Sequence, residues 1–310
     1  MNRDRIVNSS NRKSRSRGRS RMNSITLTAA AVSLIVLAGC TSMKDKTHEA
    51  VGQAAGSLEQ SLIKVAEDWG QRSREAGLAR DISTSSQVSK ATTLSLDHSV
   101  GNIKISAYDG EEIRINTTVW FGKSTKLESR QHILDQAEVA VTEKGGQLTI
   151  ATHPKGEQQN TSLWTWAEKK YGISDFMIDY VIEVPDLIDS YDIHNDVGVV
   201  ELYDLKGSYN ISSEVGSIQM NNAYITGKSS IQTTTGGVSM HIADMNEESR
   251  LNVKTTVGNI ELNLDDAVQC TLVTKSEVGG ISGAQKGTSE INGGGGEITL
   301  QSEIGMITVK

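Results

Sequence analysis

A short alternation of apolar and polar residues returns eight times along the chain, each time around a glycine. The glycines are Gly101, Gly198, Gly216, Gly236, Gly258, Gly279, Gly296 and Gly305. Two residues after the glycine every copy has Ile or Val, the next residue is always polar, and an apolar residue follows in every copy except that of Gly279. This period of two is the pattern of half-buried β-strands. The sequence therefore predicts an all-β fold made of repeated strands.

The residues around each glycine predict how one repeat bends. An apolar residue usually precedes the glycine, so the inward-facing parity changes across it, as at a bulge or corner. Three residues before the glycine stands a polar residue that the same parity places inside, where we expect it to bond between coils: Asn195, Ser213, Thr233, Thr255, Ser276 and Ser302.

Spacing of the copies predicts the architecture. From Gly198 to Gly296 successive glycines are 17 to 22 residues apart. We therefore expect a parallel β-helix-like solenoid of glycine-cornered coils of about 20 residues, preceded by an N-terminal helix. The last two copies are only nine residues apart, so we expect the array to close with half a coil.

Residues 1–39 have the pattern of a lipoprotein signal peptide. A basic start is followed by the apolar run from Ile25 to Ala38, which is short for a membrane span. The run ends in Leu-Ala-Gly-Cys40, which resembles the bacterial lipobox. The resemblance implies that Cys40 becomes the mature N-terminus and is acylated, with palmitate among the expected acyl groups. An uncleaved signal anchor with an incidental cysteine is the alternative.

Charge narrows the range of partners. Removing residues 1–39 takes eight basic residues and Asp4 from the chain's 31 basic and 38 acidic residues, which leaves 23 and 37 and a net charge of −14. So acidic a chain disfavours nucleic acid and anionic lipid as direct partners. We therefore expect membrane contact through the lipid on Cys40. Cys270 is then the one remaining cysteine, and its parity predicts a core position.

Between the signal and the repeats lies a segment, 40–91, that predicts a tether and a helix. From about Glu49 to Ala79 an apolar seam repeats at spacings of four and three: Val51, Ala55, Leu58, Leu62, Val65 and Trp69. The helix could cap the first coil of the solenoid or pair with another chain. Residues 82–90 predict a linker, and the solenoid domain is expected over residues 92–310.

The region from Asp179 to Met220 resembles the bacterial putative-adhesin family of β-strand-repeat proteins, a domain family defined without a known function. The features shared with it are a strand ending in Val184-Pro185, the alternating strand that follows and the glycine-centred repeats. The resemblance extends over roughly residues 92–310. It implies a right-handed β-helix-like domain on the cell surface. It transfers no catalytic residue, because the family has no established site motif.

Candidate chemistry is sparse. The six histidines have no metal-ligand spacing, and the run from Gly293 to Gly296 lacks the Lys-Ser or Lys-Thr of a phosphate loop. An outward acidic column recurs at Asp196, Glu214, Glu277 and Glu303, which suits a solvated face better than a calcium or catalytic row. We expect no catalytic residue, no metal and no cofactor.

The segment 154–174 departs from the repeat pattern because it is rich in aromatic residues. Trp164 and Trp166 would share a face if this segment were an extended loop, and Tyr171 lies nearby. Exposed aromatic side chains on a loop can stack on sugars or anchor a protein partner. These three residues are therefore the candidate ligand contacts; the alternative is that they plug the side or the end of the solenoid.

These patterns together predict a lipid-anchored protein of the bacterial cell envelope. We expect its β-solenoid to present a surface for binding, adhesin-like and without catalysis, to a cell-wall glycan or an envelope protein. One alternative is an envelope-stress accessory lipoprotein that acts through a membrane partner. Another is a polysaccharide-active enzyme built on a β-helix.

Overall fold

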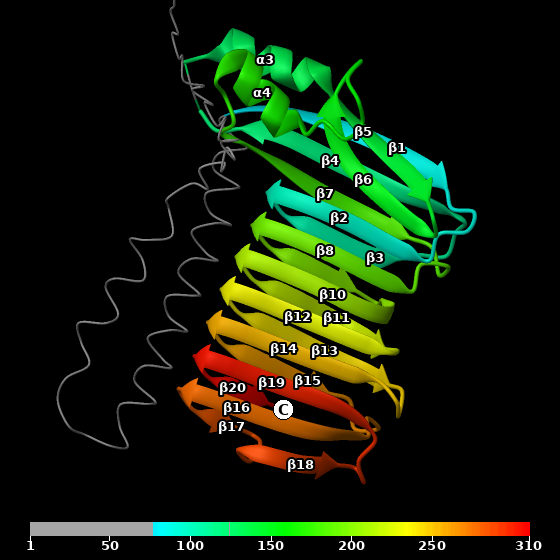
Figure 1. The fold of residues 1–310 in the computed structure, drawn as a ribbon, viewed down its shortest axis with the longest axis vertical. Coiled ribbons are helices and arrows are strands. Elements are labelled where there is room, and N and C mark those ends of the chain that lie inside the picture. The colour runs from blue at the N-terminus through cyan, green and yellow to red at the C-terminus, as the bar shows by residue number, and fades with distance from the viewer. Residues whose placement is uncertain (1–76, 124) are drawn as a thin grey trace, which may run out of the picture. The chain divides into compact units, whose positions relative to one another are not determined.

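The computed structural model describes residues 77–123 and 125–310. This part of the chain is predominantly β, as the alternating pattern predicted, and its strands lie in two stacks (Figure 1). The signal peptide, Cys40 and the helix seam from Val51 to Trp69 lie outside the described residues.

The first stack holds the strands that run up to each corner glycine. In hydrogen-bonding order its strands are β5 (Ala137–Lys144), β6 (Gln147–Pro154), β2 (Thr93–Val100), β8 (Ser190–Val197), β10 (Lys206–Val215), β12 (Lys228–Thr235), β14 (Arg250–Val257), β19 (Gly296–Ile304), β16 (Cys270–Val278) and β18 (Gly287–Ile291). All neighbours from β6 to β16 are parallel, and the outermost strand at each end is antiparallel.

The second stack holds the strands that leave each corner. Its order is β1 (Leu78–Gln87), β4 (Glu112–Phe121), β7 (Phe176–Val184), β3 (Ile103–Ala107), β9 (Val200–Tyr203), β11 (Ile218–Ile225), β13 (Val238–Met245), β15 (Ile260–Leu264), β20 (Ile307–Val309) and β17 (Ile281–Ser282). A short pairing of β10 with β11 joins the two stacks into one continuous ladder.

Equivalent repeat positions stack on one another across the coils. Ile211 lies opposite Ile193 on one side and Ile231 on the other, and Ile231 lies opposite Val253. All four are buried, and each such side chain stabilises the fold by about 1.5–3 kcal/mol through the apolar surface that it removes from water.

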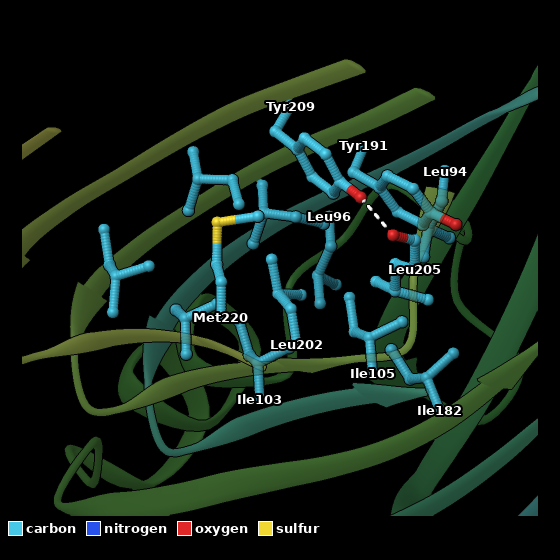
Figure 2. Close-up of a cluster of buried hydrophobic side chains, with 14 of the residues drawn as sticks. Leu94, Leu96, Ile103, Ile105, Ile182, Tyr191, Leu202, Leu205, Tyr209 and Met220 are labelled. Carbon is cyan, nitrogen blue, oxygen red and sulfur yellow. Dashed lines mark hydrogen bonds between the residues drawn. The ribbon is translucent and has the colours of Figure 1, made fainter. Parts of the chain in front are cut away.

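The core continues between the stacks at the early coils (Figure 2). Leu96 and Ile103 are buried there, and the rings of Tyr191 and Tyr209 stack with centroids 5.3 Å apart. The Tyr209 hydroxyl donates to the Leu205 carbonyl at 2.6 Å, so this buried polar group is satisfied.

Corner glycines form a column in which each packs against the preceding coil. A β-carbon on Gly236 would lie 1.9 Å from the Gly216 carbonyl oxygen, and the φ of Gly236 is +144°. The inner polar column is buried as predicted, and its bonds go to the corner backbone: Thr233 donates to the Gly216 carbonyl and Thr255 to that of Gly236. The residue before the glycine is half-exposed rather than inward.

The order of the last coils differs from the expected half-coil ending. β19 lies between β14 and β16, so Leu300 is opposite Val253 on one side and Thr274 on the other. The corner column accordingly runs from Gly258 to Gly305 and then to Gly279. Gly296 is not a corner, because it begins β19 opposite Cys270, which is buried as predicted.

Two further expectations are wrong at the level of single elements. Residues 82–87 belong to β1, not to a linker, and Leu78 and Ala79 begin that strand rather than end a helix. β1 is polar at many positions but alternates in burial and pairs along its whole length with β4. A strand therefore precedes the expected domain start at residue 92.

Two helices lie beside the first strands (Figure 1). α3 spans Leu127–Gln136. α4 (Leu163–Tyr171) replaces the expected loop. Both helices contribute buried side chains to the core: Ile133, Leu134, Leu163 and Ala167. Between them in sequence, β5 and β6 form an antiparallel hairpin that turns at Gly145-Gly146.

Candidate binding surfaces

Trp164 and Trp166 do not share a face, because α4 is helical and residues two apart point in different directions. Trp164 is turned toward the core. Its ring stacks on Phe176 with centroids 5.6 Å apart and an interplanar angle of 11°, and its Nε1 donates to the Phe176 carbonyl at 3.0 Å. Trp164 therefore packs the end of the solenoid, as the alternative reading of the sequence proposed.

The rings of Trp166 and Tyr171 lie side by side. Their ring centroids are 5.6 Å apart, and His132 of α3 stacks beside Trp166 at 6.5 Å. The Tyr171 hydroxyl lies 2.7 Å from His132 Nδ1, and the Lys170 ammonium lies 4.9 Å from the centre of the Trp166 ring. We call His132, Trp166, Lys170 and Tyr171 the aromatic cluster. Its two aromatic rings are only partly buried, and His132 and Lys170 are exposed.

His98 belongs to the inner polar column, because it lies opposite Asn195 in register. Only 2% of its surface is exposed, and its ring packs against Trp164 and Tyr180. Burial lowers the pKa of His98 from 6.5 to about 4, because the charged imidazolium would lose its hydration. Its Nε2 has no hydrogen-bond partner among the described residues. A neutral, enclosed histidine of this kind packs in the core.

A groove lies along one edge of the second stack, where β9, β11 and β13 end. It encloses about 260 Å³ and is lined by Asp204, Lys206, Tyr224, Ile225, Thr226, Asp244, Met245 and Asn246. We call it the corner groove. Lys206 lies opposite Tyr224 in register, and Tyr224 lies opposite Asp244. An ammonium, a phenol ring and a carboxylate therefore follow one another across three successive coils.

The chemistry of the corner groove suits a polar ligand with an apolar face. The Tyr224 side chain points outward and is 37% exposed, while Ile225 beside it is buried. Asn222 donates to the Asp204 carboxylate at 2.7 Å, and the Met245 amide donates to the Asp244 carboxylate at 2.8 Å, so both carboxylates are held in place. An aromatic ring surrounded by fixed donors and acceptors is typical of small-ligand sites.

Sequence reasoning missed the corner groove because its residues lie in the return segments between the repeated phrases. The available signal was Tyr224, a large aromatic residue at an outward strand position beside the inward Ile225. Nothing in the sequence indicated that Lys206 and Asp244, on neighbouring coils, would flank it. That placement depends on the stacking register.

The acidic column is paired with basic groups at several coils. Asp196 lies 3.1 Å from His194 Nε2, Glu303 lies 2.9 Å from Lys254 Nζ and Glu277 lies 3.2 Å from Lys275 Nζ. Within residues 77–123 and 125–310, no three His, Cys, Asp or Glu side chains come together as metal ligands. The same part of the chain contains no helix that is both long and apolar enough to span a membrane.

Comparisons with known proteins agree with the resemblance expected from the sequence. Residues 187–301 match the family model described as Toastrack DUF4097. A solved structure of a "putative cell adhesion protein" from Clostridium sporogenes is 13% identical, with a TM-score of 0.44 over 74% of this chain and 99% of that chain. A "putative adhesin" from Bacteroides fragilis is 13% identical, with a TM-score of 0.32 over 74% and 97%. A search of curated proteins finds no match. Residues 187–301 are thus similar to the Toastrack DUF4097 family, and the resemblance to a putative-adhesin family without a known function is confirmed.

Proposed function

We propose that this protein is a lipid-anchored, non-catalytic binding protein of the bacterial cell envelope. In this proposal the lipid on Cys40 holds the chain at a membrane, and the solenoid presents its surface to a ligand outside the cytoplasm. The exposed Tyr224 ring between Lys206 and Asp244 is the observation that carries the binding role. A rigid scaffold supports it, because parallel strands hold the groove residues on three successive coils.

A glycan of the cell wall is the ligand that fits this groove best. One face of a sugar ring carries C–H groups that pack on an aromatic ring, while its hydroxyls both donate and accept hydrogen bonds. The corner groove supplies both kinds of contact. Asp204 and Asp244 accept, the Lys206 ammonium donates, and Thr226 and Asn246 can do either.

The aromatic cluster is a second proposed contact. Trp166 and Tyr171 were expected to touch a ligand, and they are partly exposed and adjacent in the fold. The Trp166 ring is already flanked by His132 and Lys170, so less of its face is free than for Tyr224. We therefore rank the aromatic cluster below the corner groove, and we assign Trp164 a supporting role.

The test is binding of residues 41–310 to isolated cell wall and to a panel of glycans. Tyr224→Ala probes the corner groove, and Trp166→Ala probes the aromatic cluster. Matched controls are Gln232→Ala, an exposed residue of β12, and Thr165→Ala, an exposed residue of α4. Circular dichroism checks that each variant folds.

We expect wild-type binding that falls at least tenfold in Tyr224→Ala and stays unchanged in both controls. A loss confined to Trp166→Ala would move the ligand to the aromatic cluster. If the folded wild-type chain binds neither the cell wall nor any glycan, the glycan-binding role is wrong.

A further inference from the structure

One row of apolar side chains stays half-exposed along the whole solenoid, at the position just before each corner glycine. Successive members of the row lie opposite one another in register: Val100, Val197, Val215, Thr235, Val257, Ile304 and Val278. Val197 is 42% exposed and Val278 is 38% exposed. We call this row the valine ridge. Six of its seven members are Val or Ile, although the corner faces solvent in the described part of the chain.

The dimensions of the valine ridge suit a helix. Seven strands at a spacing of about 4.8 Å give a row about 29 Å long, which runs across the strands. On the far side of the glycines the residues on the central coils are small and buried, as Ser217 and Gly237 show. A helix laid on the ridge would therefore meet no bulky side chains on that flank of the central coils.

The chain reaches the described fold at one end of this same corner. Gly101, the first corner glycine, packs under the Ile178 carbonyl of β7. Ile178 lies opposite Val119 of β4, and Val119 lies opposite Arg80 of β1. Figure 1 accordingly shows β1 starting on the side where β2, β8 and β10 end. The chain therefore enters β1 on the same edge as the valine ridge, three strand spacings, or about 14 Å, beyond its Val100 end.

The sequence just before that point contains an apolar seam of matching length. From Val51 to Trp69 its members recur at helical spacing, and 18 residues of helix extend about 27 Å. The nine residues from Trp69 to Leu78 can span up to about 30 Å when extended, so Trp69 can reach the near end of the ridge. The seam and the ridge are both apolar and similar in length, and burial of one against the other would remove both from water.

We propose that residues 51–69 form an amphipathic helix that docks its seam along the valine ridge of the same chain. The entry point sets the direction: Val65 lies near Val197, and Val51 lies near Val278. Docking in this direction buries both apolar rows, which are the driving force for association. The proposal does not depend on the ligand of the corner groove.

Disulfide trapping in residues 41–310 tests both the contact and its direction. The paired variants are Val65→Cys with Val197→Cys, and Val51→Cys with Val278→Cys. The swapped variants combine Val65→Cys with Val278→Cys, and Val51→Cys with Val197→Cys. Both sets replace the same four valines by cysteine and differ only in which two positions are combined. Each set therefore serves as the control for the other. Cys270 is buried and does not compete.

Under mild oxidation we expect the paired variants to form an intramolecular disulfide at least tenfold faster than the swapped ones. Val65→Cys with Ser239→Cys, an exposed position on the second stack, should not cross-link. Equal rates in both sets, faster cross-linking of the swapped set or no cross-linking would overturn the proposal. Disulfide-linked dimers alone would also overturn it and would assign the ridge to the helix of a second copy.

Because a cysteine could weaken docking, hydrogen exchange on the otherwise unaltered chain provides a second measurement. Amides between Val51 and Trp69 should be protected in the wild type, and Val215→Lys in the middle of the ridge should reduce that protection at least tenfold. Glu214→Lys, the exposed neighbour on the same strand, should leave it unchanged. Absence of protection in the wild type, or equal protection in both variants, contradicts docking.

Discussion

At the corners of the solenoid, the glycine and the inner polar residue both lie against the same backbone carbonyl group. The glycine must lack a β-carbon because the carbonyl of the preceding glycine occupies that space, 1.9 Å from where the β-carbon of Gly236 would lie. The inner polar residue donates to that carbonyl at several corners, as Thr233 does to Gly216 and Thr255 to Gly236, whereas Ser213 Oγ has no hydrogen-bond partner among the described residues. Steric exclusion and hydrogen bonding thus act on the same atom, and this explains why both positions recur through the repeats.

Replacing Gly236 by alanine should destabilise the solenoid strongly. The added methyl group collides with backbone, which cannot move aside as a side chain can, and the φ of +144° is strained for any L-residue. We expect a loss of about 2–4 kcal/mol in the free energy of unfolding, measured by urea denaturation. Gly280→Ala is the matched control, because that corner residue has open space around it and should change stability by less than about 0.5 kcal/mol.

His98 should make stability depend on pH between 6.5 and 4. Above pH 6.5 the imidazole of His98 is neutral in both the folded and the unfolded chain. Below pH 6.5 the unfolded chain binds a proton on His98, whereas the folded chain binds it only near the lowered pKa of about 4. Stability therefore falls as the pH drops, by about 2 kcal/mol at pH 5. His98→Asn, which copies the Asn195 of the next coil, should lack this part of the pH dependence. Parallel urea-unfolding curves at pH 7.5 and 5 check it, and equal losses in both proteins would argue against it.

At the scale of the elements, the insertion of β19 determines how the solenoid ends. β14 and β16 are consecutive in the repeat but do not pair with each other; β19 lies between them and pairs with both in parallel. The strand β19 therefore joins the coil of β14 to the coil of β16, although it follows both in sequence. The coil made by β16 and β17 depends on a segment that follows it in sequence.

Deleting residues 296–310 tests that dependence. Without β19 and β20, β16 loses its parallel neighbour and β17 loses the strand with which it pairs in the described part of the chain, so we expect hydrogen-exchange protection to be lost in β16 and β18. Strands β8, β10 and β12 should keep their protection, because their pairings are untouched. A chain lacking only Lys310 is the control. Retained protection of β16 would mean that it can stack directly on β14.

Periodicity could predict most of the inward-facing residues, although not the half-exposed residue before each corner glycine, and it could not predict which coils are neighbours. The Ile and Val two residues after each glycine are equivalent in sequence. Nothing local therefore shows whether the coil of Gly305 stacks next after the coil of Gly258 or next after the coil of Gly279. Gly296 fits the repeated phrase, yet it begins a strand opposite Cys270, and only the register excludes it as a corner.

The candidate site was less predictable than the fold for a related reason. Trp164 and Trp166 share a face only if extended, and the helix of α4 separates them. The corner groove needs Lys206, Tyr224 and Asp244 side by side, which arises from pairing between three coils. Aromatic content could be read from the sequence, whereas the juxtaposition of polar groups around Tyr224 could not.

At the scale of the whole molecule, the proposed function assigns anchoring and binding to separate segments. In our proposal the lipid on Cys40 supplies membrane attachment, since a chain with a net charge of −14 after residue 39 would be repelled by anionic lipid. The solenoid then contributes no membrane affinity of its own. Attachment should accordingly be insensitive to salt, unlike that of a protein held by surface charge.

Cys40→Ala should remove the anchor and leave the fold intact, because residue 40 precedes every described strand. We expect the variant to remain as uncleaved precursor or to leave the membrane fraction, and to lose labelling by a palmitate analogue. Cys270→Ala is the control, since Cys270 is buried and its pKa is raised by burial, so it should remain unacylated. Membrane attachment and processing that survive Cys40→Ala would show that another segment anchors the protein. An altered circular dichroism spectrum would instead show that the N-terminal region contributes to folding.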